Sequence, residues 1–216
     1  MSSADRPRKL PIKALGVLAV LALLAAVIAG VAQRATGARI AANQHAAALA
    51  VLHSVLPADT HDNDLLADAI EAVDGELLGS TKPHRIYRAR KNGAPAGVVM
   101  EVTARGGYGG PIELLLGIYA DGSVAAVRIG ANHETPGIGD GIERKDWISQ
   151  FDGRSLTDPP PEDWLVKRDG GNFDQLTGAT ISPRAVVKGV YNGLQYYRNH
   201  QREIYDLPPL PPSAGP

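Results

Sequence analysis

The most regular pattern of apolar positions lies near the C-terminus, between Ser182 and His200. Its apolar residues recur at intervals of three or four, which predicts a helix with one face against a core: Val186, Val190, Leu194 and Tyr197. Ser182 followed by Pro183 is typical of a helix N-cap and a first helical position. A second helix, rich in alanine and leucine, is predicted over Ile40–Leu56, ending before Pro57.

Between these helices the pattern changes to short apolar runs separated by turn signals, which predicts strands. Four strands are expected: Arg85–Arg90, Gly97–Ala104, Ile112–Tyr119 and Ser123–Gly130. The segments 91–93 and 120–122 both end in glycine and are typical of turns. Two shorter helices are expected at Asp64–Val73 and Glu143–Phe151. Helices flanking a mostly antiparallel sheet make an α+β fold, here with one N-terminal transmembrane helix.

That transmembrane helix is predicted from an uninterrupted apolar run, Ala14–Ala32. Its 19 residues carry no charge, and at 1.5 Å per residue they suffice to cross a hydrocarbon core of about 30 Å. Four basic residues and one acid precede the run, and this positive excess favours a cytoplasmic N-terminus. The alternative is a cleaved signal peptide, because the segment 30–32 offers small residues to a peptidase, although the run exceeds the usual length of a signal core.

The chain is therefore expected to comprise four parts. These are a cytoplasmic N-terminus (1–13), a transmembrane helix (14–32), a periplasmic domain (33–205) and a proline-rich tail (206–216) that is extended or disordered. About 180 residues follow the apolar run, which suits one domain with a substantial core. We expect a single-pass protein of the bacterial inner membrane.

Composition narrows the chemistry. The 216 residues include no cysteine, which excludes disulfides, cysteine-ligated iron–sulfur clusters and thioether-attached haem. The six histidines are scattered without metal-ligand spacing, so no metal site is predicted. A formal net charge of −1 gives no reason to expect nucleic acid as a partner. A redox role would therefore use an organic cofactor.

The candidate cofactor site is the segment Asp174–Thr180, which directly precedes the predicted C-terminal helix. Gly178 and Ala179 leave room for close approach to the backbone, and Thr180 supplies a hydroxyl. A helix N-terminus presents free N–H groups and a partial positive charge, so it is suited to bind phosphate. On composition alone, however, the segment is also an ordinary loop before a helix.

This segment resembles the FMN-binding domain of the Rnf and Nqr respiratory complexes. The family pattern Asp-x-x-Ser/Thr-Gly-Ala-Thr is matched at Asp174, Thr177, Gly178, Ala179 and Thr180. Two further family segments occur in the expected order. One is the glycine-rich stretch from Tyr108 to Ile112, and the other is the loop formed by Glu134, Thr135, Pro136, Gly137, Gly139 and Asp140. Alone, each would be a flexible loop or a turn. Gly141 stands where family members often have lysine.

The resemblance implies that FMN is joined covalently to Thr180 by a separate flavin transferase that takes FMN from FAD. Asp174 would help the transferase or cap the turn. The remaining residues implied near the cofactor are Thr177, Gly178, Ala179, Ser182, Glu134, Thr135, Gly137 and Tyr108. The chain would relay electrons in an Rnf-type ion-translocating complex between ferredoxin and NAD. Its partners would be the other subunits, the transferase and membrane lipid. Alternatives are the C subunit of a sodium-translocating NADH:quinone reductase, an anchored scaffold without flavin, and a released periplasmic flavoprotein.

Overall fold

The computed structural model describes residues 12–134, 140–177 and 179–211; it does not describe the side chains of residues 12–15, 32–36, 38 and 140. The chain divides into two compact units, Met1–Ala47 and Ala48–Pro216. In the first unit the described residues belong to α1 (Ile12–His53). Within the described part of the chain, no helix combines the length and the apolarity that a membrane crossing requires.

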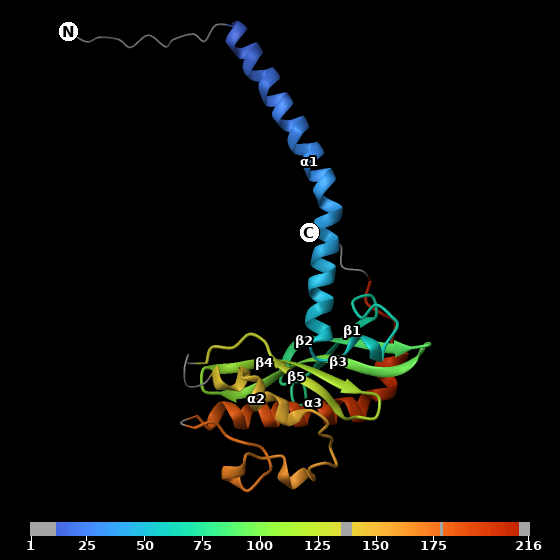
Figure 1. The fold of residues 1–216 in the computed structure, drawn as a ribbon, viewed down its shortest axis with the longest axis vertical. Helices are drawn as coiled ribbons and strands as arrows, with labels where there is room; N and C mark the ends of the chain where they lie inside the picture. Colours follow the sequence, from blue (N-terminus) through green and yellow to red (C-terminus); the bar gives the residue numbers. More distant parts are fainter. Residues whose placement is uncertain (1–11, 135–139, 178, 212–216) are drawn as a thin grey trace, which may run out of the picture. The chain divides into compact units, whose positions relative to one another are not determined.

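The second unit is built on a five-stranded antiparallel sheet in which each strand pairs with the next along the chain (Figure 1). The strands are β1 (Ala69–Asp74), β2 (Ser80–Lys91), β3 (Ala94–Gly107), β4 (Gly110–Tyr119) and β5 (Val124–Ile129). The four strands expected from the sequence correspond to β2–β5, and the expected α+β fold is confirmed.

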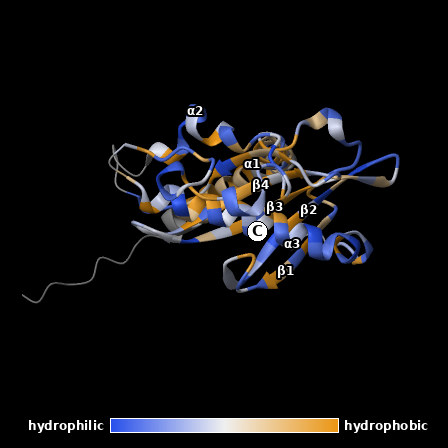
Figure 2. Cartoon of the chain, turned by 90° about the horizontal axis from the view of Figure 1, so that it is seen from below, coloured by the Kyte–Doolittle hydropathy of each residue, from blue (hydrophilic) through white to orange (hydrophobic). Residues whose placement is uncertain are grey.

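Side chains alternate between the two faces of this sheet, as strand geometry requires. One face packs against α3 (Ile181–Asp206), the helix expected near the C-terminus. Its core includes Val98, Met100 and Val102 of β3 together with Val186, Val190 and Leu194 of α3. The opposite face packs against the end of α1 and the segment after it: Leu52, Val55, Leu56 and Leu65. Figure 2 shows hydrophobic residues along the strands and hydrophilic ones along the outer turns.

Two glycines let α3 approach the sheet closely. A Cβ on Gly189 would lie 2.7 Å from the Cβ of Ala104 in β3, and a Cβ on Gly193 would lie 2.8 Å from Leu116 in β4. Real Cβ atoms do not approach neighbours so closely, so larger residues here would force the helix away from the sheet. These contacts fix the distance between α3 and the sheet. The candidate site lies at the first turn of α3.

The prediction of a helix at Asp64–Val73 is wrong. The Asp64 carboxylate accepts a hydrogen bond from the backbone N–H of Leu66 at 2.9 Å, which forms a local turn. The chain then continues as β1, in which Ala69 pairs with Tyr87 of β2. The expected helix at Glu143–Phe151 is broken into three short pieces: η2 (Asp140–Glu143), α2 (Lys145–Ile148) and η3 (Ser149–Phe151). Two other 3-10 turns follow them, η4 (Pro161–Asp163) and η5 (Lys167–Asp169).

A buried ion pair joins the end of α3 to the sheet. Arg88 of β2, only 1% exposed, pairs with Asp68, which also accepts a hydrogen bond from Arg90 at 2.7 Å. The Arg88 guanidinium also donates to the carbonyl oxygens of Ile204, at 3.0 Å, and Leu207. Beyond α3, the backbone N–H of Leu210 donates to the carbonyl oxygen of Ala69 in β1 at 2.7 Å. The C-terminal segment is thus held to β1 and β2.

Candidate functional site

Thr180 lies at the junction between the motif loop and α3. It occupies the N-cap position, but its side chain makes no capping hydrogen bond. Instead, its Oγ1 accepts a hydrogen bond from Nη1 of Arg168 at 3.3 Å, and the side chain is only partly buried. The hydroxyl therefore stays accessible beside a guanidinium group and the unpaired N–H groups of a helix N-terminus.

Ser182, expected as the N-cap, is the second residue of α3 instead. Its side chain is 1% exposed, and its hydroxyl accepts a hydrogen bond from the backbone N–H of Tyr108 at 3.2 Å. Pro183 is accommodated because a residue in the first helical turn has no intrahelical partner for a backbone N–H. Ser182 thus ties the glycine-rich loop to α3, a role that its position before a proline did not suggest.

The motif loop is anchored through the backbone of Asp174. The Nε1 of Trp147 donates to the Asp174 carbonyl oxygen at 2.7 Å, and the Asp174 N–H donates to Oε1 of Gln150, also at 2.7 Å. Further along, the N–H of Ala179 donates to the carbonyl oxygen of Leu176 at 3.1 Å, which closes a turn. Thr177 within this turn is exposed, and Gly178 lies outside the described residues. The sequence motifs did not predict Trp147 or Gln150 as supports of this loop.

Two ion pairs flank Thr180. The Lys167 ammonium lies 2.6 Å from Oδ1 of Asp174. The Arg184 guanidinium, one helical turn beyond Thr180, contacts both carboxylate oxygens of Asp169, at 2.5 and 2.6 Å. The hydrogen bonds from Arg184 hold the pKa of Asp169 below its ordinary value. The Asp174 carboxylate is therefore paired with a cation.

The glycine-rich loop and the segment after β5 meet at Glu134. One carboxylate oxygen of Glu134 accepts a hydrogen bond from the N–H of Gly109 at 3.1 Å. The side chain is 8% exposed, and its second oxygen has no hydrogen-bond partner among the described residues. A Cβ on Gly109 would lie 2.0 Å from the carbonyl oxygen of His133, so only glycine allows this approach. Thr135 and Gly137 lie outside the described residues.

The departure from the family pattern at Gly141 has a structural counterpart. A Cβ on Gly141 would lie 2.8 Å from a methyl group of Leu176 in the motif loop. Gly141, where family members often have lysine, therefore lies directly against the motif loop. Tyr108, in contrast, is 72% exposed. Among the described residues, the structure thus brings three sequence motifs together around the N-terminus of α3.

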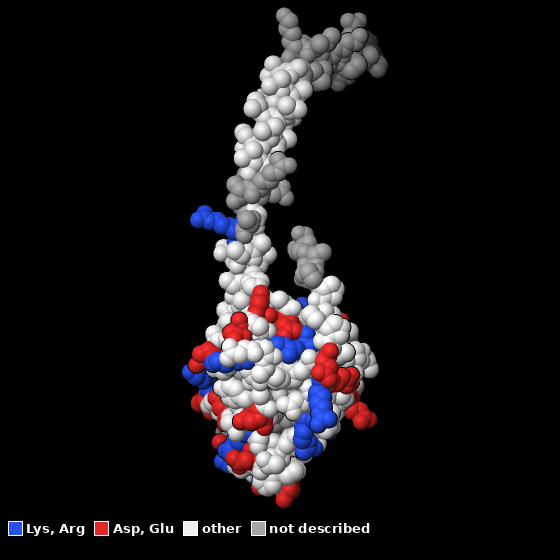
Figure 3. All heavy atoms as spheres, turned by 90° about the vertical axis from the view of Figure 1, so that its right-hand side faces the viewer, with Lys and Arg blue, Asp and Glu red and all other residues white. Residues whose placement is uncertain are grey.

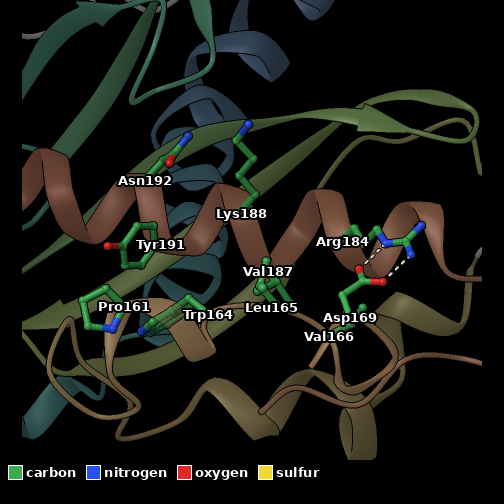
Figure 4. Close-up of a pocket in the computed structure, with 10 residues that line it drawn as sticks. All are labelled: Pro161, Trp164, Leu165, Val166, Asp169, Arg184, Val187, Lys188, Tyr191 and Asn192. Atoms are coloured by element: carbon green, nitrogen blue, oxygen red, sulfur yellow. Dashed lines mark hydrogen bonds and ion pairs between the residues drawn. The ribbon is translucent and has the colours of Figure 1, made fainter. Parts of the chain in front are cut away.

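A pocket of about 420 Å³ has the Arg184–Asp169 pair at one end (Figure 4). Trp164 and Tyr191 lie at its other end, with their ring centroids 5.4 Å apart, and Val187 and Lys188 of α3 lie between the two ends. Trp164 is itself buried and donates to the carbonyl oxygens of Ser155 and Pro159, both at 3.2 Å. No sequence motif predicted this pocket.

The fold and the site define an α+β domain that presents a threonine hydroxyl, with a cationic neighbour, at the start of a long helix. These features fit a phosphate-linked cofactor, because the guanidinium and the helix N-terminus both favour an anion on Thr180. The Glu134 carboxylate oxygen that has no partner among the described residues offers a further polar group.

Comparisons with known proteins identify the family. Residues 107–195 match the FMN-binding domain. The crystal structure of Shewanella oneidensis NqrC aligns with a TM-score of 0.47 at 19% identity, covering 62% of this chain and 68% of that chain. The G subunit of the ion-translocating oxidoreductase complex of Cereibacter sphaeroides is 45% identical over 191 residues, 88% of this chain and 84% of that protein. The G subunit of the Shewanella baltica complex is 45% identical over 73% of this chain and 76% of that protein. The chain belongs to the family formed by the G subunits of ion-translocating oxidoreductase complexes.

Proposed function

We propose that this chain is the flavin-carrying subunit of an Rnf-type electron transport complex, with FMN joined covalently to Thr180. The observation that carries the proposal is the state of the Thr180 hydroxyl. It lies at the N-terminus of α3, is free of any capping hydrogen bond and accepts a hydrogen bond from Arg168. A hydroxyl in this place can be esterified without loss of an interaction that holds the helix.

Attachment is the work of a flavin transferase that uses FAD. A bond forms between the Thr180 oxygen and the phosphorus of the FMN half, the pyrophosphate bond of FAD breaks, AMP leaves and the hydroxyl proton is released. In this proposal the transferase recognises the loop through the Lys167–Asp174 ion pair. The hydrogen bonds between the Asp174 backbone and the side chains of Trp147 and Gln150 hold the loop in place.

Once attached, FMN supplies the electron-accepting and electron-donating chemistry, and the chain fixes its position. The backbone N–H of Ser182, in the first turn of α3, would help to hold the phosphate. Tyr108 offers an exposed aromatic ring, and Glu134 a buried carboxylate oxygen without a partner among the described residues. Thr135, Gly137, Gly178 and Ala179 complete the proposed surroundings. No proton-transferring side chain is needed for electron relay.

We also propose that Ala14–Ala32 anchors the chain in the bacterial inner membrane, with the flavin domain on the periplasmic side. The described large apolar residues of this run are all more than half exposed, from 51% to 69%: Val17, Leu18, Val20, Leu21, Leu23, Leu24, Val27, Ile28 and Val31. Figure 3 shows no charged side chain among the described part of this run. Exposed apolar surface around a whole helix is suited to lipid. The partners would be lipid and the other subunits of the complex.

The decisive experiment is co-expression of the full chain with an active flavin transferase. We expect in-gel flavin fluorescence after denaturation and a mass increase equal to one FMN adduct. Thr180→Val should abolish both signals, whereas Thr81→Val, at an exposed threonine of β2 outside the three motifs, should retain them. Absence of an adduct on the unaltered chain would overturn the covalent proposal and favour a scaffold without flavin.

A further inference from the structure

Arg168 differs from the other basic residues around Thr180 because it has no carboxylate partner in the described structure. Lys167 is paired with Asp174 and Arg184 with Asp169, at distances of 2.5 to 2.6 Å. Arg168 makes no ion pair among the described residues, and its Nη1 donates to the Thr180 hydroxyl at 3.3 Å. The neighbouring cations are engaged elsewhere, whereas Arg168 is directed at the proposed attachment atom.

When Arg168 is counted with the two ion pairs beside it, one positive charge has no carboxylate at pairing distance among the described residues. Three cations, Lys167, Arg168 and Arg184, stand against two carboxylates, Asp169 and Asp174. A phosphodiester on Thr180 would carry one negative charge, so its formation would balance this group. The hydroxyl contact also places the guanidinium where phosphate oxygens would lie, and arginine binds such oxygens with parallel N–H donors.

The backbone holds Arg168 in this position. It lies in the η5 turn, which ends at Gly170 with a φ of 90°, a conformation that favours glycine. The Arg168 N–H donates to Oε1 of Gln175 in the motif loop at 3.3 Å, so the turn and the loop are joined. A second bond, from Lys167 N–H to the carbonyl oxygen of Phe173 at 2.7 Å, joins the same two segments.

We infer that Arg168 is the counter-ion of the flavin phosphodiester and orients the phosphate on Thr180 by charge-assisted hydrogen bonding. The inference rests on the proposed covalent attachment and names the residue that would hold the attached group. Arg168 is a positioning residue: it contacts the tether and not the ring that carries electrons.

The test compares the melting temperature of the loaded and unloaded full chain, with loading verified by mass. Loading should raise the melting temperature of the unaltered chain by roughly 1–3 °C more than that of Arg168→Gln, as expected for one exposed charged contact in a chain of this size. Arg168→Lys should keep part of this gain. In 1 M salt, where the Debye length is about 3 Å, the difference should shrink by more than half.

Arg198→Gln is the matched control, because it removes an exposed arginine of α3 about 27 Å farther along the helix. It should behave as the unaltered chain does. An equal gain on loading for Arg168→Gln and the unaltered chain overturns the inference while the adduct itself still supports covalent attachment. An unaltered chain without adduct overturns the proposed attachment instead.

A second measurement does not depend on the transferase. Thr180→Glu places a carboxylate near the Arg168 guanidinium, and the unloaded single and double variants with Arg168→Gln form a double-mutant cycle. We expect the Glu substitution to lower the melting temperature by about 1–2 °C more when Arg168 is also replaced. Additive effects in this cycle, for chains that remain folded by circular dichroism, overturn the inference even if Arg168→Gln cannot be loaded.

Discussion

The Ser182 hydroxyl accepts a hydrogen bond from the backbone N–H of Tyr108 at 3.2 Å, so the first turn of α3 holds the glycine-rich loop. Ser182→Ala leaves this N–H without its acceptor in a partly buried contact. We expect a loss of about 1–2 kcal/mol in the free energy of unfolding, measured by urea denaturation, and faster amide exchange at Tyr108 and Gly109. Ser54→Ala, at an exposed serine, should change stability by less than about 0.5 kcal/mol.

The close approach of Gly189 to Ala104 reverses an ordinary expectation. Glycine to alanine in a helix interior normally stabilises by about 1 kcal/mol. Here the new methyl group would meet the Ala104 Cβ at 2.7 Å and Leu114 at 3.0 Å. Gly189→Ala should therefore destabilise by about 1–3 kcal/mol in chemical denaturation. Adding Ala104→Gly should recover part of the loss, and simple additivity of the two substitutions would contradict the contact.

Two arginine–aspartate pairs should differ in their contribution to stability because one is buried and the other is exposed. Asp68→Asn removes the charge beside Arg88, whose side chain is 1% exposed, and should cost about 3–5 kcal/mol. Asp146→Asn breaks a pair in which both side chains are 66% exposed, and should leave the free energy of unfolding nearly unchanged. Urea denaturation of both variants checks the difference. Similar losses would contradict the larger contribution expected of the buried pair.

The Asp169–Arg184 pair predicts a specific pH dependence. Arg184 lowers the pKa of Asp169 from its ordinary value of 3.8, so the folded state binds this proton more weakly than the unfolded state. The stabilisation is complete above pH 3.8 and is lost as the pH falls through the lowered pKa. In an NMR titration the Asp169 pKa should lie below 3.8 in the unaltered chain and return toward it in Arg184→Gln. An unchanged pKa in the variant would argue against the pairing.

The absence of cysteine allows a direct test of topology. Thr157→Cys introduces a single thiol at an exposed position of the flavin domain, and Ser3→Cys introduces one before the apolar run. In intact cells with a permeabilised outer membrane, a membrane-impermeant maleimide should label the first variant and not the second. The second should become labelled after lysis. Equal labelling of both variants in intact cells would contradict the proposed orientation.

Regular patterns allowed much of the fold to be predicted from the sequence. The stripe of α3 and the apolar runs of β2–β5 each repeat over enough residues to define the element. The prediction of a helix at Asp64–Val73 failed because the helical pattern there extends over few residues. The hydrogen bond that the Asp64 carboxylate accepts from Leu66 and the pairing of Ala69 with Tyr87 determine the conformation instead. Long-range strand pairing is not encoded in local periodicity.

The candidate site could likewise be predicted from the sequence only in part. The motif predicted where Thr180 lies, at the start of the last long helix, because a helix and a preceding loop are local features. It did not predict Arg168, which reaches Thr180 only through the hydrogen bonds between η5 and the motif loop. The Ser182–Pro183 sequence predicted a helix cap at Ser182. The contact of Ser182 with Tyr108 could not be predicted, because it joins residues far apart in the chain.

The bond from Leu210 to Ala69 has a consequence for self-association. β1 forms one border of the sheet, and the edge of a sheet exposes backbone groups that can pair with another molecule. The segment after α3 engages one such carbonyl group at 2.7 Å and places Leu210 against the core that includes Ala69 and Tyr87. The proline residues of this segment cannot donate further ladder bonds, so it covers the border without itself extending the sheet.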